Sequence, residues 1–331
     1  MTYGSGAARG IFLLVSLVCS LSAAAQTVNS SARTAFIDKM VAQHKFDRAA
    51  LTSLLDEAVI DKTILDTMAR PAERVVPWFE YRDRFLTEKR ILQGTDFWIE
   101  HGETLRRIPD PNVAASVVGI LGVETSFGRI TGRYRVIDAL ATLAFDYPPR
   151  GDFFRSELQQ FLLLSREEAV DPRTALGSYA GAMGAPQFIS SSYRTYAIDG
   201  DGNGKRDLWN SWDDVIGSVA NYLLAYGWRE GEPVVVTATL PSDDLSRFNI
   251  AKLELNETVQ SLRDKGVRFE TSLPADAPAL LIVAQGKDGP VYRVGFTNFY
   301  VVTRYNRSPM YAMAVHDLGQ AVVNFMRDAT R

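Results

Sequence analysis

The sequence contains little cysteine and no excess of charge of one sign. Its 331 residues include one cysteine, Cys19, near the N-terminus, so the chain cannot form an internal disulfide. A protein of this length can bury enough apolar surface to fold without such cross-links. Lysine and arginine total 36 against 39 acidic residues, for a net charge of −3. That balance argues against a nucleic-acid-binding protein, which normally carries a basic surface.

Residue patterns typical of several enzyme classes are also missing. The three histidines, His44, His101 and His316, are far apart and lack the spacing of a zinc site. Ser126 lacks the context of a nucleophile elbow, and the chain has no phosphate-binding loop. No apolar run is long enough to cross a membrane as a helix, so we expect the mature protein to be soluble. Carboxylates are therefore the better catalytic candidates.

The N-terminal segment has the pattern of an export signal. Arg9 is the only charged residue before position 32, and residues 11–21 form a short apolar run. Three alanines at 23–25 supply a small-x-small cleavage site before Gln26, so we expect residues 1–25 to be a cleaved signal peptide. A lipoprotein site would need Leu and a small residue where Ser16 and Val18 stand. We therefore expect a periplasmic protein that is not a lipoprotein, rather than one held by an uncleaved anchor.

The rest of the chain predicts an α+β protein that is mainly helical. Helices are expected at 32–44, 48–58 and 77–101, through most of 112–230, and at 309–328. Short β-branched runs bounded by Pro, Gly or Asp predict strands at 234–240, 267–271, 279–284 and 291–302. This pattern divides the mature chain into a helical region (26–110), a core (111–230), a small β module (231–302) and a C-terminal segment (303–331).

Glu124 is the most informative residue because it follows an otherwise apolar stretch. In a helix it shares one face with Val117, Ile120 and Leu121. Apolar surroundings disfavour the charged form of a carboxylate and raise its pKa, as a general acid for glycosidic cleavage requires. The alternative is a Glu that caps the helix or pairs with a buried arginine. This segment alone does not separate the two interpretations.

A second pattern, at 199–207, predicts a calcium loop. Asp199, Asp201 and Asn203 place side-chain oxygens at positions 1, 3 and 5, a Gly follows, and the carbonyl of Lys205 is available at position 7. This alternation suits Ca²⁺ better than Mg²⁺. Position 12 is Asn210, so the closing carboxylate would come from Asp213 or Asp214. A plain Asp/Gly turn is the alternative.

Residues 178–193 combine small, polar and aromatic side chains. Ser178, Gln187 and the tyrosines of this segment offer hydrogen bonds and flat apolar faces. That combination suits a sugar, although aromatic residues more often belong to a core.

Taken in order, these motifs resemble the B-type lytic murein transglycosylases over roughly residues 35–330. The resemblance is carried by Gly-Val-Glu-Thr-Ser-Phe-Gly at 122–128, Tyr-Ala-Gly-Ala-Met-Gly-Ala-Pro-Gln-Phe at 179–188, the Asp-Gly-Asp-Gly loop, Asn-Tyr-Leu at 221–223, Asn-Phe-Tyr at 298–300 and Arg-Tyr-Asn-Arg-Ser at 304–308. It implies a lysozyme-like core flanked by helical and β regions, with an EF-hand-like calcium loop. It also implies cleavage of the MurNAc–GlcNAc β-1,4 bond of peptidoglycan without water, leaving a 1,6-anhydro-MurNAc end.

The resemblance implies a role for individual residues. Glu124 matches the single catalytic acid and base of the family. The positions that match the glycan groove are Arg150, Ser178, Tyr179, Gln187, Tyr222, Tyr305, Asn306 and Tyr311. The calcium ligands would be Asp199, Asp201, Asn203, the Lys205 carbonyl, and Asp213 or Asp214, with Asp213 as our first choice. Pro149 replaces a second arginine found in some relatives, so one substrate contact is expected to be missing.

We expect a monomer whose partners are peptidoglycan glycan strands and proteins of cell-wall synthesis or remodelling. Binding to nucleic acid is not expected. Two rival functions remain open from the sequence. A hydrolytic muramidase would need a second carboxylate opposite Glu124, for which Asp138, Asp146 and Asp152 are the candidates. A calcium-stabilised glycan-binding protein would keep the groove without needing Glu124.

Overall fold

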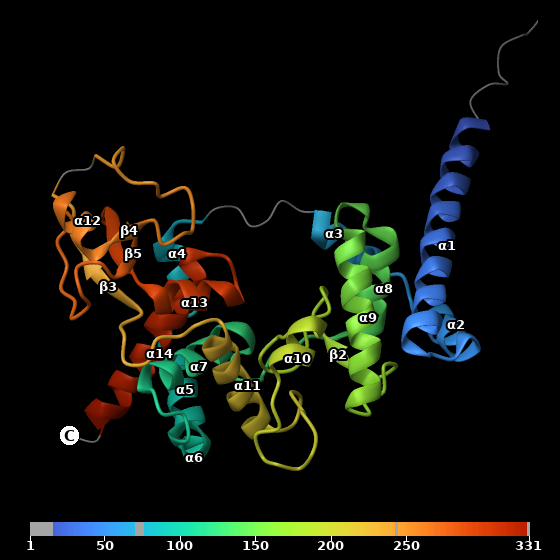
Figure 1. Ribbon diagram of the computed structural model, residues 1–331, viewed down its shortest axis with the longest axis horizontal. Helices are drawn as coiled ribbons and strands as arrows, with labels where there is room; N and C mark the ends of the chain where they lie inside the picture. Colours follow the sequence, from blue (N-terminus) through green and yellow to red (C-terminus); the bar gives the residue numbers. More distant parts are fainter. Residues whose placement is uncertain (1–15, 70–75, 242–243, 330–331) are drawn as a thin grey trace, which may run out of the picture.

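The computed structural model describes residues 16–69, 76–241 and 244–329, and for residues 16–29 it describes the backbone alone. Among these residues, helices predominate and the strands form small antiparallel sheets, so the predicted α+β, mainly helical class is confirmed. Figure 1 shows two groups of helices joined by a segment of loops and short elements, with the β module beside one of them.

One helical group combines the N-terminal helices with two helices from the middle of the chain (Figure 1). Helix α8 packs against α9, and α1 and α3 contact α8. The members of this group are α1 (Ser16–His44), α2 (Arg48–Asp56), α3 (Lys62–Ala69), α8 (Val136–Asp146), the 3-10 turn η1 (Pro148–Arg150) and α9 (Gly151–Glu167). N-terminal and central segments therefore share one apolar core, whose buried residues come from the sequence between Phe36 and Val322.

The second group surrounds α7 (Pro111–Thr125), the helix that carries Glu124. Helix α7 contacts α14, α5 and α11, and most of its residues are buried, as expected of a helix that is apolar on nearly every side. The other members of this group are α4 (Trp78–Asp83), α5 (Glu88–Glu100), α6 (Gly102–Arg106), α11 (Trp212–Ala225), α13 (Thr297–Tyr305) and α14 (Pro309–Ala329).

Helices α7 and α14 approach closely because glycines lie at their contact. A Cβ atom added to Gly119 would lie 2.1 Å from the Val315 carbonyl oxygen, and one added to Gly319 would lie 2.2 Å from the Ala115 carbonyl oxygen. A side chain at either position would force the two backbones apart. The glycines thus fix the separation of the helices that carry Glu124 and Tyr311.

Loops and short elements connect the two groups. Strand β1 (Tyr134–Arg135) pairs antiparallel with β2 (Leu176–Gly177), and residues 178–189 continue from β2 into α10 (Ser190–Tyr196). Helix α10 packs against both α9 and α11. Residues 178–193, the polar and aromatic segment of the sequence, therefore lie where the two helical groups meet.

The β module is a four-stranded antiparallel sheet with the order β3-β6-β5-β4. Its elements are β3 (Val235–Ala238), β4 (Glu257–Thr258), α12 (Val259–Asp264), β5 (Pro278–Gln285) and β6 (Pro290–Gly295). Residues between Ala238 and Phe296 form an apolar core of their own under this sheet. An ion pair between Arg293 of β6 and Asp317 of α14, at 2.6 Å, joins the module to the helices.

Several predicted boundaries were wrong. Residues 267–271 form no strand, because only Arg268 bridges to Thr239. Residues 297–302 are helical rather than extended, since the buried positions Asn298, Phe299, Val301 and Val302 follow a helical period. The helix expected at 77–101 is split into α4 and α5 because Thr87 caps the N-terminus of α5.

The first helix begins before the predicted residue 32. It starts at Ser16, and no Pro or Gly interrupts residues 16–44. Part of the predicted signal peptide thus lies in α1, while residues 1–15 lie outside the described residues. Within the described part of the chain, no helix combines the length and apolar character needed to cross a bilayer.

Candidate active site

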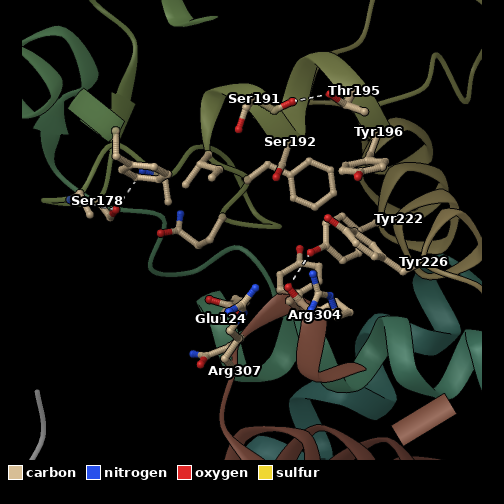
Figure 2. A pocket seen from close by; sticks show the side chains of 18 of the residues that line it. Glu124, Ser178, Ser191, Ser192, Thr195, Tyr196, Tyr222, Tyr226, Arg304 and Arg307 are labelled. Carbon is tan, nitrogen blue, oxygen red and sulfur yellow. Dashed lines mark hydrogen bonds between the residues drawn. The ribbon is translucent and has the colours of Figure 1, made fainter. Parts of the chain in front are cut away.

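A groove of about 950 Å³ lies between the two helical groups, and Figure 2 shows it from close by. The sequence-predicted residues that line it are Glu124, Arg150, Ser178, Tyr179, Gln187, Tyr222, Tyr305 and Asn306. Residues separated by up to about half of the chain therefore meet around one cavity. Tyr311, the remaining predicted groove residue, is buried and reaches this site through Glu124.

Glu124 lies in the last turn of α7, with its carboxyl group at the groove. The Tyr311 hydroxyl of α14 donates a 2.6 Å hydrogen bond to Glu124 Oε1. Burial raises the pKa of Glu124 to about 7, and the Tyr311 hydrogen bond opposes this shift. This shift has the direction that the apolar neighbours of Glu124 suggest, and a pKa of about 7 leaves the carboxyl group about half protonated at neutral pH.

The residues that follow Glu124 end the helix and hold its end in place. Ser126 has a left-handed backbone (φ 52°), which stops α7. The Thr125 hydroxyl donates to the Ala185 carbonyl at 2.8 Å and accepts from the Gly128 amide at 3.0 Å. The Glu-Thr-Ser-Phe-Gly motif therefore fixes the carboxylate relative to the loop on the opposite wall.

That opposite wall is the loop at 178–188. The Ser178 hydroxyl oxygen accepts from the Ala182 amide at 3.0 Å, which closes the turn. Gln187 has a left-handed backbone (φ 51°). Its side-chain nitrogen Nε2 donates to the backbone carbonyls of Thr131 and Gly184 at 3.0 and 2.9 Å. These contacts leave the Ser178 hydrogen and the Gln187 side-chain oxygen for a ligand.

Tyrosines form a further wall of the groove. The Tyr222 hydroxyl donates to the Arg304 carbonyl at 2.7 Å, and the Tyr305 hydroxyl donates to the Pro186 carbonyl at 2.5 Å. Their rings lie 4.9 Å apart, and Tyr226 lies 4.7 Å from Tyr222. The hydroxyls tie α11 and α13 to their neighbours, and the rings supply the apolar surface that sugar C–H groups prefer.

Among the residues with a described position, no second carboxylate lines the groove. Asp138 forms an ion pair with Arg135 at 2.7 Å, and Asp152 forms one with Arg155 at 2.5 Å. Burial raises the pKa of Asp146, which is not among the lining residues. Among the residues that the structure describes, Glu124 is the only acidic residue lining the groove, and no lysine or arginine forms an ion pair with it.

Sequence reasoning missed a second set of groove residues. The lining side chains not predicted include Phe153, Phe188, Ser191, Ser192, Thr195, Tyr196, Tyr226, Arg304 and Arg307. The i, i+4 spacing of Tyr222 and Tyr226 in a helical segment could have identified Tyr226. Arg304 and Arg307 flank Tyr305 and Asn306 in a motif that was recognised, although neither was assigned a role.

The predicted calcium loop brings three carboxylates together. Ligand oxygens of Asp199, Asp201 and Asp214 lie within 4.8 Å of one another. Backbone amides of Gly202 and Gly204 donate to Asp199 at 2.7 Å, which wraps the loop around this point. Three carboxylates this close repel one another unless a cation joins them, so the residues fit a Ca²⁺ site.

Asp213, our first choice for the closing ligand, points elsewhere. Its carboxylate accepts a hydrogen bond from the Thr104 hydroxyl and lies 3.4 Å from the Arg107 guanidinium. Asp214 instead faces the loop and accepts from the Gly200 and Asp207 amides at 2.7 and 2.6 Å. Asp214, which is buried at the start of α11, therefore completes the cluster with Asp199 and Asp201, and Asp213 does not.

The chain is similar to known transglycosylases. A family model described as a transglycosylase SLT domain matches residues 29–320. The chain is 38% identical to membrane-bound lytic murein transglycosylase B of Escherichia coli, over 96% of this chain and 90% of the relative.

Solved structures are also similar. Soluble lytic transglycosylase SltB1 from Pseudomonas aeruginosa matches with a TM-score of 0.84 and 46% identity, over 88% of this chain and 98% of that one. Escherichia coli Slt35 in complex with calcium matches with a TM-score of 0.77 and 39% identity, over 88% of this chain and 92% of that one. Pseudomonas aeruginosa SltB3 in complex with NAG-anhNAM-pentapeptide matches with a TM-score of 0.76 and 30% identity, over 88% of this chain and 78% of that one.

Proposed function

Because this chain belongs to the transglycosylase SLT domain family, we propose that it is a lytic transglycosylase that cleaves the MurNAc–GlcNAc β-1,4 bond of peptidoglycan without water. Its relatives are named lytic transglycosylases, and one similar protein, SltB3, was solved in complex with NAG-anhNAM-pentapeptide. The observation that carries the proposal is a single half-buried carboxyl group, Glu124, which lines the groove, accepts a hydrogen bond from Tyr311 and has a pKa raised to about 7.

In the first step, protonated Glu124 donates its proton to the glycosidic oxygen while positive charge develops at C1 of MurNAc. The C1–O bond breaks, and the GlcNAc-side product leaves with the proton. The N-acetyl carbonyl of the substrate assists by sharing the charge at C1. The Tyr311 hydrogen bond to Oε1 leaves Oε2 to carry the proton toward the groove.

In the second step, ionised Glu124 removes the proton from the C6 hydroxyl of the same MurNAc. The C6 oxygen then forms a bond to C1, which closes the 1,6-anhydro ring and restores protonated Glu124. One carboxyl group performs both transfers, so no second carboxylate is required. A hydrolase would need one to activate water, and no described residue supplies it in the groove. Mass spectrometry of digested peptidoglycan, with 1,6-anhydro ends as the expected products, tests the proposal.

Activity should fall on the alkaline side of the Glu124 pKa. The first step needs the protonated form, so kcat/KM should decrease by about tenfold per pH unit above about pH 7. The Tyr311 hydrogen bond lowers the pKa of Glu124, and Tyr311→Phe should therefore move this decrease to higher pH. Profiles of kcat/KM against pH for the native protein and for Tyr311→Phe check this. If kcat/KM of the variant falls at the same pH as in the native protein, or at a lower one, the prediction is wrong.

We also propose that Asp199, Asp201, Asn203, the Lys205 carbonyl and Asp214 bind a structural Ca²⁺. A similar structure was solved with calcium, and the three carboxylates of the cluster match the ligands that this ion prefers. The ion would join the loop after α10 to the start of α11, and these helices carry Tyr196 and Tyr222 to the groove. Its role would be to stabilise the groove wall.

Chelation should lower stability. If Ca²⁺ is present at 100 times its Kd, removing it with EDTA lowers the free energy of unfolding by about 2.7 kcal/mol and the Tm by about 5–10 °C. Asp214→Asn should remove most of this sensitivity to EDTA. Asp213→Asn, which changes a carboxylate bonded to Thr104, should retain it. Equal melting curves of the native protein with and without EDTA would contradict a bound ion.

We propose a periplasmic location reached by cleavage after Ala25. The apolar run at 11–21 and the small residues at 23–25 support it. One chain supplies both the acid and the groove, so a monomer suffices for the proposed activity, and glycan strands are its partner. We also propose that the protein contacts proteins of cell-wall synthesis or remodelling.

N-terminal sequencing of protein recovered from the periplasm should begin at Gln26. Ala25→Arg should block cleavage, because signal peptidase requires a small residue at this position. Recovery of the intact N-terminus from the native sequence would contradict the signal peptide.

A further inference from the structure

A second, smaller cavity lies in the β module, between the segment after β3 and the end of α12 (Figure 1). Its volume is about 240 Å³, and among the described residues it shares none with the groove. Four of its lining side chains are cationic, and no described acidic residue lines it, although the whole chain has a net charge of −3. We call it the basic pocket, and its main lining residues are Leu240, Arg247, Arg263, Lys265, Val267 and Arg268.

Backbone hydrogen bonds fix the walls of the basic pocket. Thr239 and Arg268 exchange two amide–carbonyl bonds of 2.9 Å, which place Leu240 beside the segment that follows α12. Gly266 has a left-handed backbone (φ 85°), and its amide donates to the Arg263 carbonyl at 2.9 Å, which ends α12. The cations of the pocket therefore project from ordered backbone.

Arg263 and Arg268 have no counter-ion within the described part of the chain. Neither guanidinium forms an ion pair or donates a hydrogen bond to a described residue, and both residues are exposed. Arg263 lies over the Phe269 ring, 5.3 Å from its centroid. Such a contact orients a guanidinium while leaving its N–H groups free to bind an anion.

The other two cations of the basic pocket do have acidic partners, which lie outside its lining. Arg247 is 3.9 Å from Asp244, and Lys265 pairs with Glu257. These acids offset two of the four positive charges, and the charges of the two unpaired arginines remain. A ligand that enters the pocket therefore meets a positive potential.

The size and the apolar part of the lining restrict the kind of anion. A volume of about 240 Å³ is below the roughly 300–1,000 Å³ that encloses a whole small ligand, so the pocket suits one end of a longer molecule. Leu240 and Val267 are buried and supply apolar surface beside the guanidinium groups. A carboxylate next to a small apolar side chain, as at the end of a peptide, matches this combination. A bilayer is a poorer partner, because buried apolar residues cannot insert into it.

We propose that the basic pocket binds terminal carboxylates of peptidoglycan peptides through Arg263 and Arg268, and so gives the enzyme a second contact with the cell wall outside the groove. The inference rests on the proposed function, which makes a polymer with many such peptides the substrate. A guanidinium binds a carboxylate with two parallel hydrogen bonds. Because the polymer repeats, one chain can bind it at the groove and at the basic pocket together, and each contact raises the effective concentration for the other.

The test measures binding to whole peptidoglycan with cleavage switched off. All proteins carry Glu124→Gln, and co-sedimentation with purified cell-wall sacculi gives an apparent Kd. Arg263→Gln and Arg268→Gln are added singly and together, and Arg229→Gln, which changes an exposed arginine that lines neither cavity, is the control. Sacculi whose carboxylates have been converted to neutral methylamides are the matched ligand.

On native sacculi each Gln variant should raise the apparent Kd about threefold and the double variant about tenfold, as expected of solvent-exposed ion pairs. Arg229→Gln should leave the Kd unchanged. On methylamidated sacculi the effect of the substitutions should vanish. Added NaCl should weaken binding more with both arginines present than in the double variant, because salt screens exposed charges.

Turnover separates the basic pocket from the groove. With Glu124 intact, the double variant should have a higher KM on sacculi and an unchanged kcat. Its kcat/KM on glycan strands without peptides should equal that of the native protein, because the pocket then has no ligand. Since both arginines are exposed, the Tm should also be unchanged.

An unchanged Kd of the double variant on native sacculi would overturn the inference. So would an equal rise on native and methylamidated sacculi, since the arginines would then contact neutral groups. Loss of binding to phosphatidylglycerol vesicles with no loss on sacculi would assign the pocket to a membrane and would also overturn it. These outcomes leave the proposed function intact as long as products end in 1,6-anhydro-MurNAc. Products with reducing ends, together with the expected rise in Kd, would defeat the proposed function and retain the peptide site.

Discussion

Glu124→Gln should abolish cleavage of peptidoglycan while the protein remains folded. An amide cannot donate or remove a proton as the carboxyl group does, so loss of both transfers should lower the rate by about 1,000-fold or more. The oxygen of the introduced amide can still accept the Tyr311 hydrogen bond seen at 2.6 Å, and binding of glycan strands should persist. Turnover measurements with purified strands, together with a binding assay, check the prediction.

The same variant should be more stable than the native protein at alkaline pH. Burial raises the folded-state pKa of Glu124 from 4.5 to about 7, so the folded state binds the proton more tightly than the unfolded state. Stability from this group is complete below about pH 4.5 and is lost as pH rises through about 7. At pH 8 the loss is on the order of 3 kcal/mol, and Glu124→Gln should remove it. The two melting temperatures should converge near pH 5.

Asp152→Asn is the matched control for this change. It also converts a carboxylate to an amide, but the Asp152 side chain is 100% exposed and lies outside the groove. Its activity and stability should equal those of the native protein. Unfolding of Glu124→Gln, unchanged turnover in that variant, or loss of activity in Asp152→Asn would each contradict a single catalytic carboxylate.

Gly119→Ala should strongly destabilise the protein. The new Cβ would lie 2.1 Å from the Val315 carbonyl oxygen, so α7 and α14 must separate. Overpacking of this kind lowers the free energy of unfolding by about 1–3 kcal/mol, which corresponds to a Tm lower by roughly 2–12 °C in a chain of this size. Activity should fall as well, because the separation also lengthens the contact between Glu124 and Tyr311. Thermal melts and turnover below the new Tm measure the two effects.

Gly102→Ala provides the comparison for Gly119→Ala. Gly102 lies in the first turn of α6, where the added Cβ would approach only the flexible end of Arg106, at 3.2 Å. Alanine also favours the helix over glycine, so this variant should melt at or slightly above the native temperature. Equal melting temperatures for Gly119→Ala and the native protein would show that the helix contact tolerates a side chain.

The sequence predicted the chemistry of the site better than its contacts. The apolar neighbours of Glu124 are within seven residues of it, so a helical period suggested a raised pKa, although it left a capping or ion-paired Glu as the alternative. Its partner Tyr311 lies 187 residues away, and no local pattern joins the two. Only a resemblance to a family could suggest Tyr311, and only the packing of α7 on α14 brings it to the carboxyl group.

The errors in the fold have a similar origin. Residues 297–302 contain β-branched and aromatic side chains, which favour a strand locally, but their buried positions pack α13 against α14. The choice between Asp213 and Asp214 depended on the direction of two adjacent side chains at the start of a helix. Spacing along the sequence cannot determine that direction, whereas the Thr104 contact of Asp213 does.

The most direct test of the account is digestion of purified peptidoglycan in H₂¹⁸O, followed by mass spectrometry of the products. If Glu124 acts as both acid and base, the muropeptides released will be lighter by one water than hydrolysis products and will carry no ¹⁸O at C1. The Glu124→Gln variant should release neither kind of product. Reducing ends labelled with ¹⁸O would show that water attacks C1, which would contradict the intramolecular closure proposed for this enzyme.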